Sequence, residues 1–164
     1  MAYALESMLK IRAMREDRAG TELTGARRAR VSAEQVRDEK AEESARFEAT
    51  KDARRDRVYA AVMGRVVSMD ELDQARAAVM KIDEEGLLLA EAERQAAEAL
   101  RKREDEAETA RVRYVDAARN KAKIDQHRLA WEAEDRRQQE MLADAEMDEF
   151  TGRKMVADDD DTFD

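Results

Sequence analysis

Apolar side chains recur every 3.5 residues through the second half of the sequence, and this repeat limits the chain to helical folds with a partner helix. Alternating steps of four and three residues between residues 75 and 131 visit seventeen positions, and twelve of these carry apolar side chains. The repeat gathers one stripe on one side of a helix and predicts a left-handed coiled coil. We call these positions the seam: Ala75, Val79, Ile82, Gly86, Leu89, Glu93, Ala96, Leu100, Arg103, Ala107, Ala110, Tyr114, Ala117, Lys121, Ile124, Arg128 and Trp131.

The composition agrees with long helices because the residues that end helices are nearly missing. The 164 residues include no Pro and five Gly, while charged residues make up 43% and aromatic residues 4%. So few large apolar residues cannot fill a globular core, and this composition is typical of long helices or coiled coils. High charge with a mean hydropathy of −0.86 is also typical of disordered chains, so disorder of the whole chain is the alternative that the seam opposes.

A helix start is encoded just after Val67. Ser68 is a favourable N-cap, and Glu71 stands three residues later, so each side chain can bind the other's free backbone N–H group in a capping box. Val67 and Leu72 occupy the positions of a hydrophobic staple across the same cap. The sequence therefore predicts a second helix that begins at Met69.

Two long helices joined by a short turn must run antiparallel to each other. We expect one helix over about 5–67, a turn near 64–68 and a second helix over about 69–150. The numbers of facing residues then sum to about 134. This register places Leu5 near residues 129–131, Leu9 near Ile124, and Phe47 near Leu87 and Leu89.

The predicted fold class is therefore all-α, a long antiparallel two-helix coiled-coil hairpin with a protruding C-terminal helix end. The second helix is the longer one, so residues after about 133 lack a partner and should project as a polar helix. In this prediction residues 1–157 form a single helical hairpin, and residues 158–164 form a disordered acidic tail.

The sequence offers no catalytic constellation, so we expect neither an enzyme nor a cofactor. It contains no Cys and one His, so the usual His and Cys ligands of a metal site cannot be assembled. His127 lies one turn before Trp131, and we expect it to pack on that ring rather than to bind a metal. No Gly-rich phosphate-binding loop is present, which argues against nucleotide hydrolysis by this chain.

The distribution of charge argues against nucleic acid as a partner. The chain carries 31 basic and 40 acidic side chains, for a net charge of −9. Its basic clusters at 27–30, 51–57 and 101–103 stand among acidic residues and lack aromatic residues for base stacking, so we expect solvated coiled-coil faces. No apolar run is long enough to span a membrane, and no signal-peptide stretch opens the sequence, so we expect a cytoplasmic protein without membrane insertion.

Apolar residues gather at both ends of the predicted hairpin. The turn region 58–72 holds more large apolar side chains than a turn needs, and Trp131 lies where the first helix runs out. Exposed apolar surface at such places is typical of docking sites. The same clusters would also serve to clamp the hairpin shut, and the residues alone leave this choice open.

Several segments resemble the YscO proteins of bacterial type III secretion systems, which are relatives of the flagellar export protein FliJ. The resemblance rests on the opening pattern Leu5-x-x-Met8-Leu9-x-Ile11-Arg12-x-x-Arg15-Glu16-Asp17-x-Ala19 and on His127-x-x-x-Trp131-Glu132, which leads into the acidic run at 146–150. The size and the hairpin break agree with it, and the likeness covers nearly the whole chain.

The resemblance implies a cytoplasmic stalk at the inner-membrane secretion apparatus. It implies that the end bearing both termini enters the hexameric secretion ATPase and stimulates it, that the other end reaches toward the export gate, and that export chaperones are further partners. Carried over by position, the ATPase-facing residues are Arg12, Arg15, Glu16, Asp17 and Trp131, and the gate-facing residues are Tyr59, Val62, Met63 and Val66.

Two other functions stay open at this point. A coiled-coil scaffold or holdase-like chaperone would grip client proteins through the apolar turn region, without any ATPase. A nucleic-acid organiser would show binding that falls steeply with salt.

Overall fold

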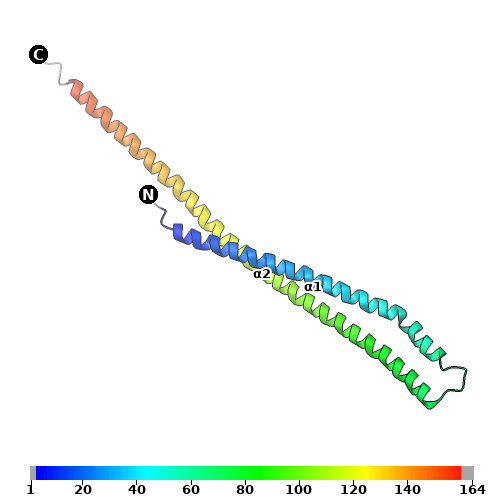
Figure 1. Cartoon of the computed structure of the whole chain (residues 1–164). Coiled ribbons are helices and arrows are strands. Elements are labelled where there is room, and N and C mark those ends of the chain that lie inside the picture. Colours follow the sequence, from blue (N-terminus) through cyan, green and yellow to red (C-terminus); the bar gives the residue numbers. More distant parts are fainter. Residues whose placement is uncertain (1–2, 160–164) are drawn as a thin grey trace. The chain divides into compact units, whose positions relative to one another are not determined.

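Two long helices make up the fold. The computed structural model describes residues 3–159, with side chains described over residues 3–148. Helix α1 spans Glu6–Ala60 and helix α2 spans Met69–Asp159, with a loop over residues 61–68 between them. The chain turns back at this loop, so that α1 packs antiparallel against α2 (Figure 1). The all-α hairpin predicted from the sequence is confirmed.

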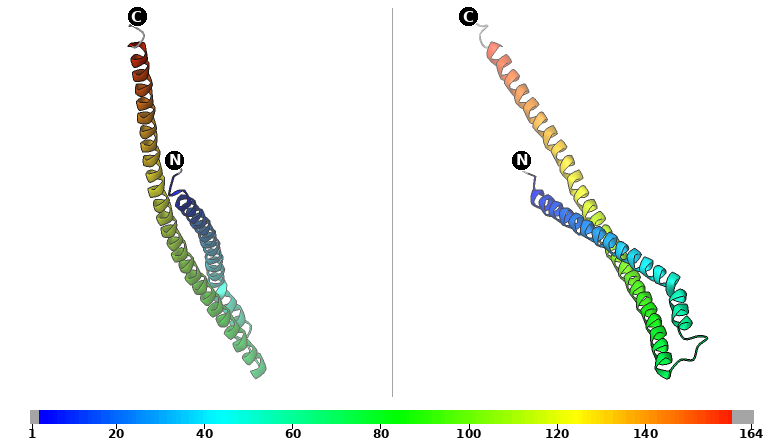
Figure 2. Two further views of the ribbon diagram at one scale, coloured as in Figure 1. Left: turned by 90° about the vertical axis from the view of Figure 1, so that its left-hand side faces the viewer. Right: turned by 45° about the vertical axis from the view of Figure 1, so that its right-hand side comes forward.

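The helix pair divides into two compact units, each built from a stretch of both helices. The loop unit is Gly20–Arg113, and the terminal unit combines Met1–Ala19 with Tyr114–Asp164. The domain bounds predicted from the sequence, a single hairpin over residues 1–157, stay a prediction. Figure 2 shows the antiparallel course of the two helices from two further directions.

Helix α1 ends at Ala60, seven residues before the end predicted at residue 67. The backbone N–H groups of Val62 and Met63 both donate to the carbonyl of Tyr59, at 3.0 and 2.9 Å, and close the last turn. Gly64 then adopts a φ of 77°, a left-handed conformation that ends helices and that Gly takes without steric cost. The connection is therefore longer than the turn predicted at 64–68.

The capping box predicted at the start of α2 is confirmed. The backbone N–H of Ser68 donates to Glu71 Oε2 at 2.8 Å, and the backbone N–H of Glu71 donates to Ser68 Oγ at 3.2 Å. These hydrogen bonds from Ser68 hold the pKa of the Glu71 carboxyl below its usual range, and Arg65 adds to the effect. The predicted staple residues Val67 and Leu72 are both half-buried beside the cap.

The seam faces the partner helix in both units, as its period predicted. In the loop unit ten of the eleven seam positions from Ala75 to Ala110 are buried or half-buried, with Arg103 as the exception. In the terminal unit all six positions from Tyr114 to Trp131 are half-buried. The most deeply buried hydrophobic side chains of the described part are Leu9, Ala19, Leu23, Phe47, Ile82, Ala96 and Ala110.

Phe47 is the largest side chain of this core, and it packs on a glycine. A Cβ atom built at Gly86 would lie 2.9 Å from Phe47 Cε1, so the ring occupies the space that a side chain there would need. Leu87, which the register placed beside Phe47, is instead 72% exposed. The guanidinium of Arg54 covers the ring at 5.3 Å from its centroid.

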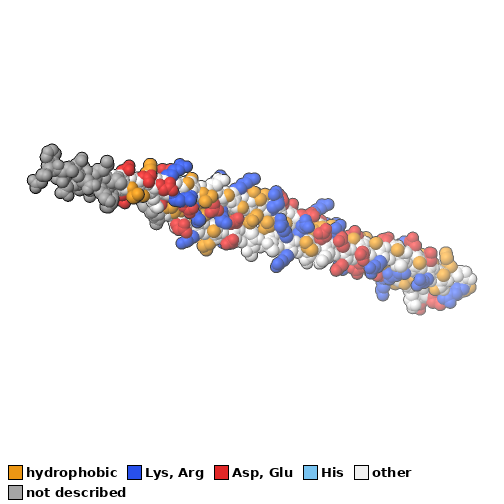
Figure 3. Space-filling view, turned by 90° about the horizontal axis from the view of Figure 1, so that it is seen from above, with side chains coloured by type: hydrophobic (Ala, Val, Ile, Leu, Met, Phe, Trp, Pro, Cys, Tyr) orange, Lys and Arg blue, Asp and Glu red, His pale blue; other side chains and the backbone are white. Residues whose placement is uncertain are grey.

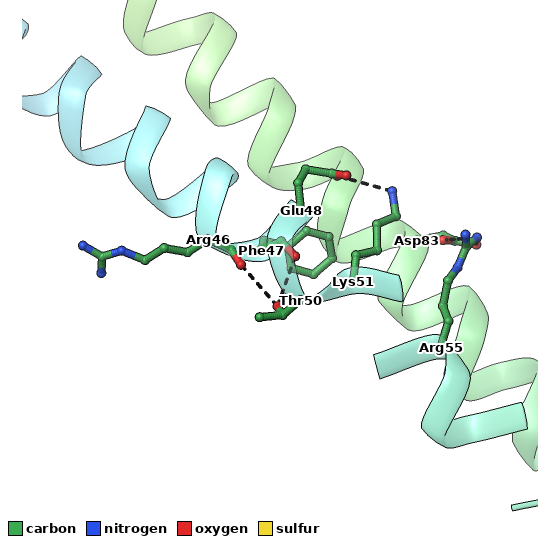
Figure 4. A network of polar contacts seen from close by, with 7 residues as sticks. All are labelled: Arg46, Phe47, Glu48, Thr50, Lys51, Arg55 and Asp83. Atoms are coloured by element: carbon green, nitrogen blue, oxygen red, sulfur yellow. Dashed lines mark hydrogen bonds and ion pairs between the residues drawn. The ribbon is translucent and has the colours of Figure 1, made fainter. Parts of the chain in front are cut away.

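Ion pairs between the helices flank Phe47 on its loop side. Arg55 bonds Asp83 at 2.7 Å, while Arg54 bonds Glu85 at 2.6 Å. In Figure 4, Arg55 reaches from α1 across to Asp83 on α2, whereas Lys51 turns to Glu48 on its own helix. The facing pairs around Phe47 have residue numbers that sum to 133–139, close to the predicted value of 134.

Helix α2 continues beyond the first residue of α1 within the terminal unit. All described side chains from residue 136 to residue 148 are exposed, as expected for a projecting polar helix. The helix runs to Asp159 rather than to residue 150, because Gly152 alone costs a helix only about 1 kcal/mol. Residues 158 and 159 of the predicted disordered tail thus belong to α2, and residues 160–164 lie outside the described part of the chain.

Gly86→Ala should destabilise the hairpin, although Ala normally favours a helix by about 1 kcal/mol over Gly. The added methyl group would meet the ring of Phe47, whose side chain is only 6% exposed and has little room to move. We expect a lower midpoint of thermal unfolding, followed by circular dichroism.

Gly25→Ala is the matched control, because no atom lies within 4 Å of the place where its Cβ would be built. It should raise the unfolding midpoint, since it gains helix propensity without a clash. Adding Phe47→Leu to the Gly86→Ala variant should relieve the clash. Equal shifts for the two alanine variants would contradict a close fit of the ring to Gly86.

Ser68→Ala should lower the free energy of unfolding by about 1 kcal/mol, because the first turn of α2 loses its cap.

The contribution of Glu71 to the free energy of unfolding depends on pH. Its pKa is lowered in the folded chain, so its stabilisation is present above the ordinary value of 4.5 and is lost as the pH falls through the lowered pKa. Urea unfolding from pH 6 to about pH 3 should therefore show a steeper acid loss in the wild type than in Glu71→Gln. Parallel pH profiles would contradict this role.

Candidate functional site

Three aromatic rings close the terminal unit near the start of α1. The Tyr3 hydroxyl and His127 Nδ1 share a hydrogen bond of 2.9 Å. The Tyr3 ring lies 5.8 Å from the His127 ring and 5.4 Å from the Trp131 ring, centroid to centroid, with both pairs tilted. Trp131 is half-buried in this arrangement. The packing of His127 on Trp131 stays a prediction, and Tyr3, which contacts both rings, was missed, although the register that sums to 134 places Tyr3 opposite Trp131.

Two of the predicted ATPase-facing residues hold the helices of the terminal unit together. Arg12 Nη1 donates to the backbone carbonyl of Asn120 on α2 at 2.7 Å. Glu16 forms an ion pair of 2.9 Å with Lys121, and both side chains are partly covered. The Glu16 carboxylate raises the pKa of Lys121 above its usual range. A role of Arg12 and Glu16 inside the fold is therefore visible in their contacts.

Arg15, in contrast, has no described contact with α2. It is exposed and forms no hydrogen bond or ion pair with any other residue of the described part. Asp17, the remaining predicted residue on this helix, is also exposed. The sequence could identify this charged stretch, but it could not tell which of its members the fold uses for itself.

An apolar strip accompanies Arg15 on the outside of α1. Met8, Ile11 and Met14 are 41%, 50% and 71% exposed. Leu9, between them, is buried, because only one side of α1 can face α2. We call Met8, Ile11, Met14 and Arg15 the outer strip. It combines exposed apolar area with one unpaired cation.

The loop unit presents a second apolar surface at residues 59–69. Tyr59, Met63, Val66 and Met69 are 46%, 73%, 102% and 69% exposed, and we call these four residues the loop tip. Val62, predicted with them, is half-buried. Met69 lies in the predicted apolar region 58–72 but was not among the four predicted gate-facing residues.

Hydrogen bonds hold the loop tip in place from both sides. Arg65 Nε donates to the carbonyl of Ala61 at 2.7 Å, and the capping box fixes the chain at Ser68. An apolar loop that is held in one conformation loses little entropy when it binds a partner. The loop tip is exposed, while Val62, Val67 and Leu72 of the same region are half-buried, so docking and clamping both stay predictions.

Charged side chains elsewhere pair mostly along one helix. Arg94 bonds Glu91 at 2.7 Å and, together with Gln95, holds the pKa of the Glu91 carboxyl at about 2. Figure 3 shows acidic, basic and hydrophobic side chains interspersed over one face. The described residues contain no group of three or more His, Cys, Asp or Glu side chains placed to hold a metal ion. Neither described helix is apolar enough over a sufficient length to cross a membrane.

Comparison with known proteins gives a family. No curated protein and no solved structure matches the chain. The model of the family described as type III secretion protein YscO matches residues 5–153, which include all nine predicted contact residues. The match thus extends over both helices and the loop between them. By this match, and in agreement with the hairpin fold, the chain belongs to the YscO family of type III secretion proteins.

Proposed function

We propose that this chain is a cytoplasmic stalk component of a type III secretion apparatus that binds and stimulates the hexameric secretion ATPase and links it to the export gate. Membership of the YscO family supports a place within this apparatus. In this proposal the protein is not itself an enzyme and lies at the periphery of the inner-membrane apparatus. Export chaperones are further partners.

The ATPase contact is supported by a difference between residues on the first turns of α1, only some of which contact α2. Arg12 and Glu16 are engaged with α2, while the outer strip and Arg15 remain available on the outside of α1. A partner can therefore bind the outer strip without opening the hairpin. A helical element inside an ATPase ring couples the states of its subunits only if it contacts them differently, and an asymmetric apolar and basic strip meets this requirement.

The loop tip is the proposed contact with the export gate. It exposes four large apolar side chains within residues 59–69, on the loop and on the helix ends that flank it. Exposed apolar clusters of this kind supply most of the binding energy in protein interfaces when a partner covers them.

A holdase-like chaperone or general coiled-coil scaffold is the second candidate, and the same loop tip favours it. Such a protein would bind unfolded clients through the apolar side chains and would not need the outer strip. Capture of the cognate hexameric ATPase by the purified chain distinguishes the two functions. A chaperone that suppresses client aggregation without binding the ATPase would replace the stalk proposal.

Adding the chain to its cognate ATPase should raise the rate of ATP hydrolysis. Arg15→Glu should increase the concentration needed for half-maximal stimulation by about threefold to tenfold at low salt, since an interfacial cation becomes a like charge for an acidic partner. The effect should shrink at high salt because exposed charges are screened. Arg12→Glu should also weaken stimulation, together with a lower unfolding midpoint, because its hydrogen bond to Asn120 is lost.

Arg113→Glu is the matched control for Arg15→Glu. It reverses another exposed arginine that has no ion pair with the described residues, and it lies in the other unit. Its stimulation should equal that of the wild type. An unchanged ATPase rate on adding the wild-type chain, or equal effects of both reversals, would overturn the ATPase contact.

Met63→Ser combined with Val66→Ser should weaken binding to the cytoplasmic part of the export gate by about tenfold or more, because two exposed apolar anchors are lost. Their exposure in the free chain means that the unfolding midpoint should not fall. Leu87→Ser with Leu88→Ser is the control, since these side chains are 72% and 71% exposed on α2 of the same unit. Titration calorimetry measures both affinities, and equal losses would show that overall hydrophobicity, rather than the loop tip, drives the binding.

A further inference from the structure

A group of arginines in the loop unit is used by neither proposed contact. Two neighbouring depressions share the side chain of Arg27. One lies between the helices, and its lining includes Leu23, Arg30 and Arg111. The other lies on α1 and includes Arg28 and Val31. We call Leu23, Arg27, Arg28, Arg30, Val31 and Arg111 the arginine patch.

Two guanidinium groups of this patch lack an acidic partner. Arg30 approaches Glu34 at 3.9 Å, and Arg111 bonds Glu108 at 2.7 Å. Arg27 and Arg28 are exposed and form no ion pair or hydrogen bond with any residue that the structure describes. In the same unit Arg54 and Arg55 both pair across to α2. The fold therefore leaves Arg27 and Arg28 available to an external anion.

The patch also offers a small apolar surface between its charges. Val31 is 46% exposed and lines the same depression as Arg27 and Arg28. Leu23 is buried at 7% exposure and forms part of the floor of the neighbouring depression. A partner that buries an apolar side chain on Val31 would bring its own charged groups within reach of both arginines.

We propose that the arginine patch binds an acidic amphipathic helix of another protein, packed as a third helix against the hairpin. Carboxylates three and four residues apart lie on one side of a helix, which matches the spacing of Arg27, Arg30 and Val31 along α1. The planar guanidinium group binds a carboxylate through two parallel hydrogen bonds. Leu or similar side chains on the same helix would cover Val31.

The rim of the patch favours a protein over a nucleic acid. Glu104 and Glu108 line the depression between the helices, beside Arg27 and Arg30. A phosphate backbone, which is negative throughout, would be repelled there, whereas a protein helix can place a Lys or Arg opposite the two glutamates. No aromatic side chain lines either depression to stack on a base.

The test uses the full chain and a synthetic fluorescein-labelled helical peptide of roughly 20 residues, with Leu and Glu repeated at helical spacing. Fluorescence anisotropy at about 50 mM and about 300 mM salt should show binding that weakens at the higher salt, where the Debye length is shorter. Arg27→Glu combined with Arg28→Glu should weaken binding by about tenfold or more at low salt. Arg27→Lys with Arg28→Lys should have an intermediate affinity for the peptide, because the positive charge is kept and the planar guanidinium group is lost.

Arg136→Glu combined with Arg137→Glu is the control. It reverses two consecutive exposed arginines on α2, outside the patch, which contact Glu132 and Glu134 of their own helix. It should bind the peptide like the wild type. Circular dichroism should show the same helicity and unfolding midpoint for all variants. Because the proposed ATPase and gate contacts lie elsewhere, the patch variants should stimulate the ATPase normally. Peptide binding therefore tests this inference, and ATPase stimulation tests the proposed function.

Three results would overturn the inference. The first is a wild-type chain that does not bind the acidic peptide at low salt, or that binds it no better than a peptide with Gln in place of Glu. The second is an equal loss of binding in the patch and control reversals. The third is tighter binding of an oligonucleotide of equal charge that the patch reversal abolishes, which would assign the arginines to phosphate instead.

Discussion

Burial along the seam between α1 and α2 is the interaction on which the rest of the structure depends. The buried apolar area is small, since three of the seven most buried hydrophobic side chains of the described part are alanines and none of these residues is completely covered. Long helices are marginal in water unless one side is buried against a partner. The capping box, the ion pairs across the helices and the aromatic contacts of Tyr3 each add to a small total, so each of them matters more than it would in a globular core.

The same thin seam explains how the chain offers contact surfaces while it stays folded. Only one side of each helix is needed for pairing, so the other sides remain free to carry other groups. The outer strip, the loop tip and the exposed patch residues Arg27, Arg28 and Val31 occupy such free sides or the connection between the helices, whereas Leu23 of the patch belongs to the core. Exchange of residues at these surfaces therefore has little effect on the stability of the hairpin, while exchange at Arg12 or Glu16 affects both folding and contact geometry.

The sequence predicted the features that follow from local chemistry or from a period. The seam and the capping box at Ser68 and Glu71 are of this kind, because spacing alone determines which residues face the partner or cap the helix. The early end of α1 was missed, since the left-handed conformation of Gly64 depends on the course of the whole loop. The division between engaged Arg12 and free Arg15 was missed as well, because two charged residues three positions apart differ only through what α2 places beside them.

The seat of Phe47 on Gly86 has a mechanical consequence for the helix pair. A seven-residue repeat permits sliding by one heptad without losing the apolar pattern, and the positions that would then face the ring are Val79 and Glu93. Both carry side chains where the ring needs an empty position. Phe47 therefore opposes axial sliding of the two helices where it packs on Gly86. A force along one helix is then carried to the other.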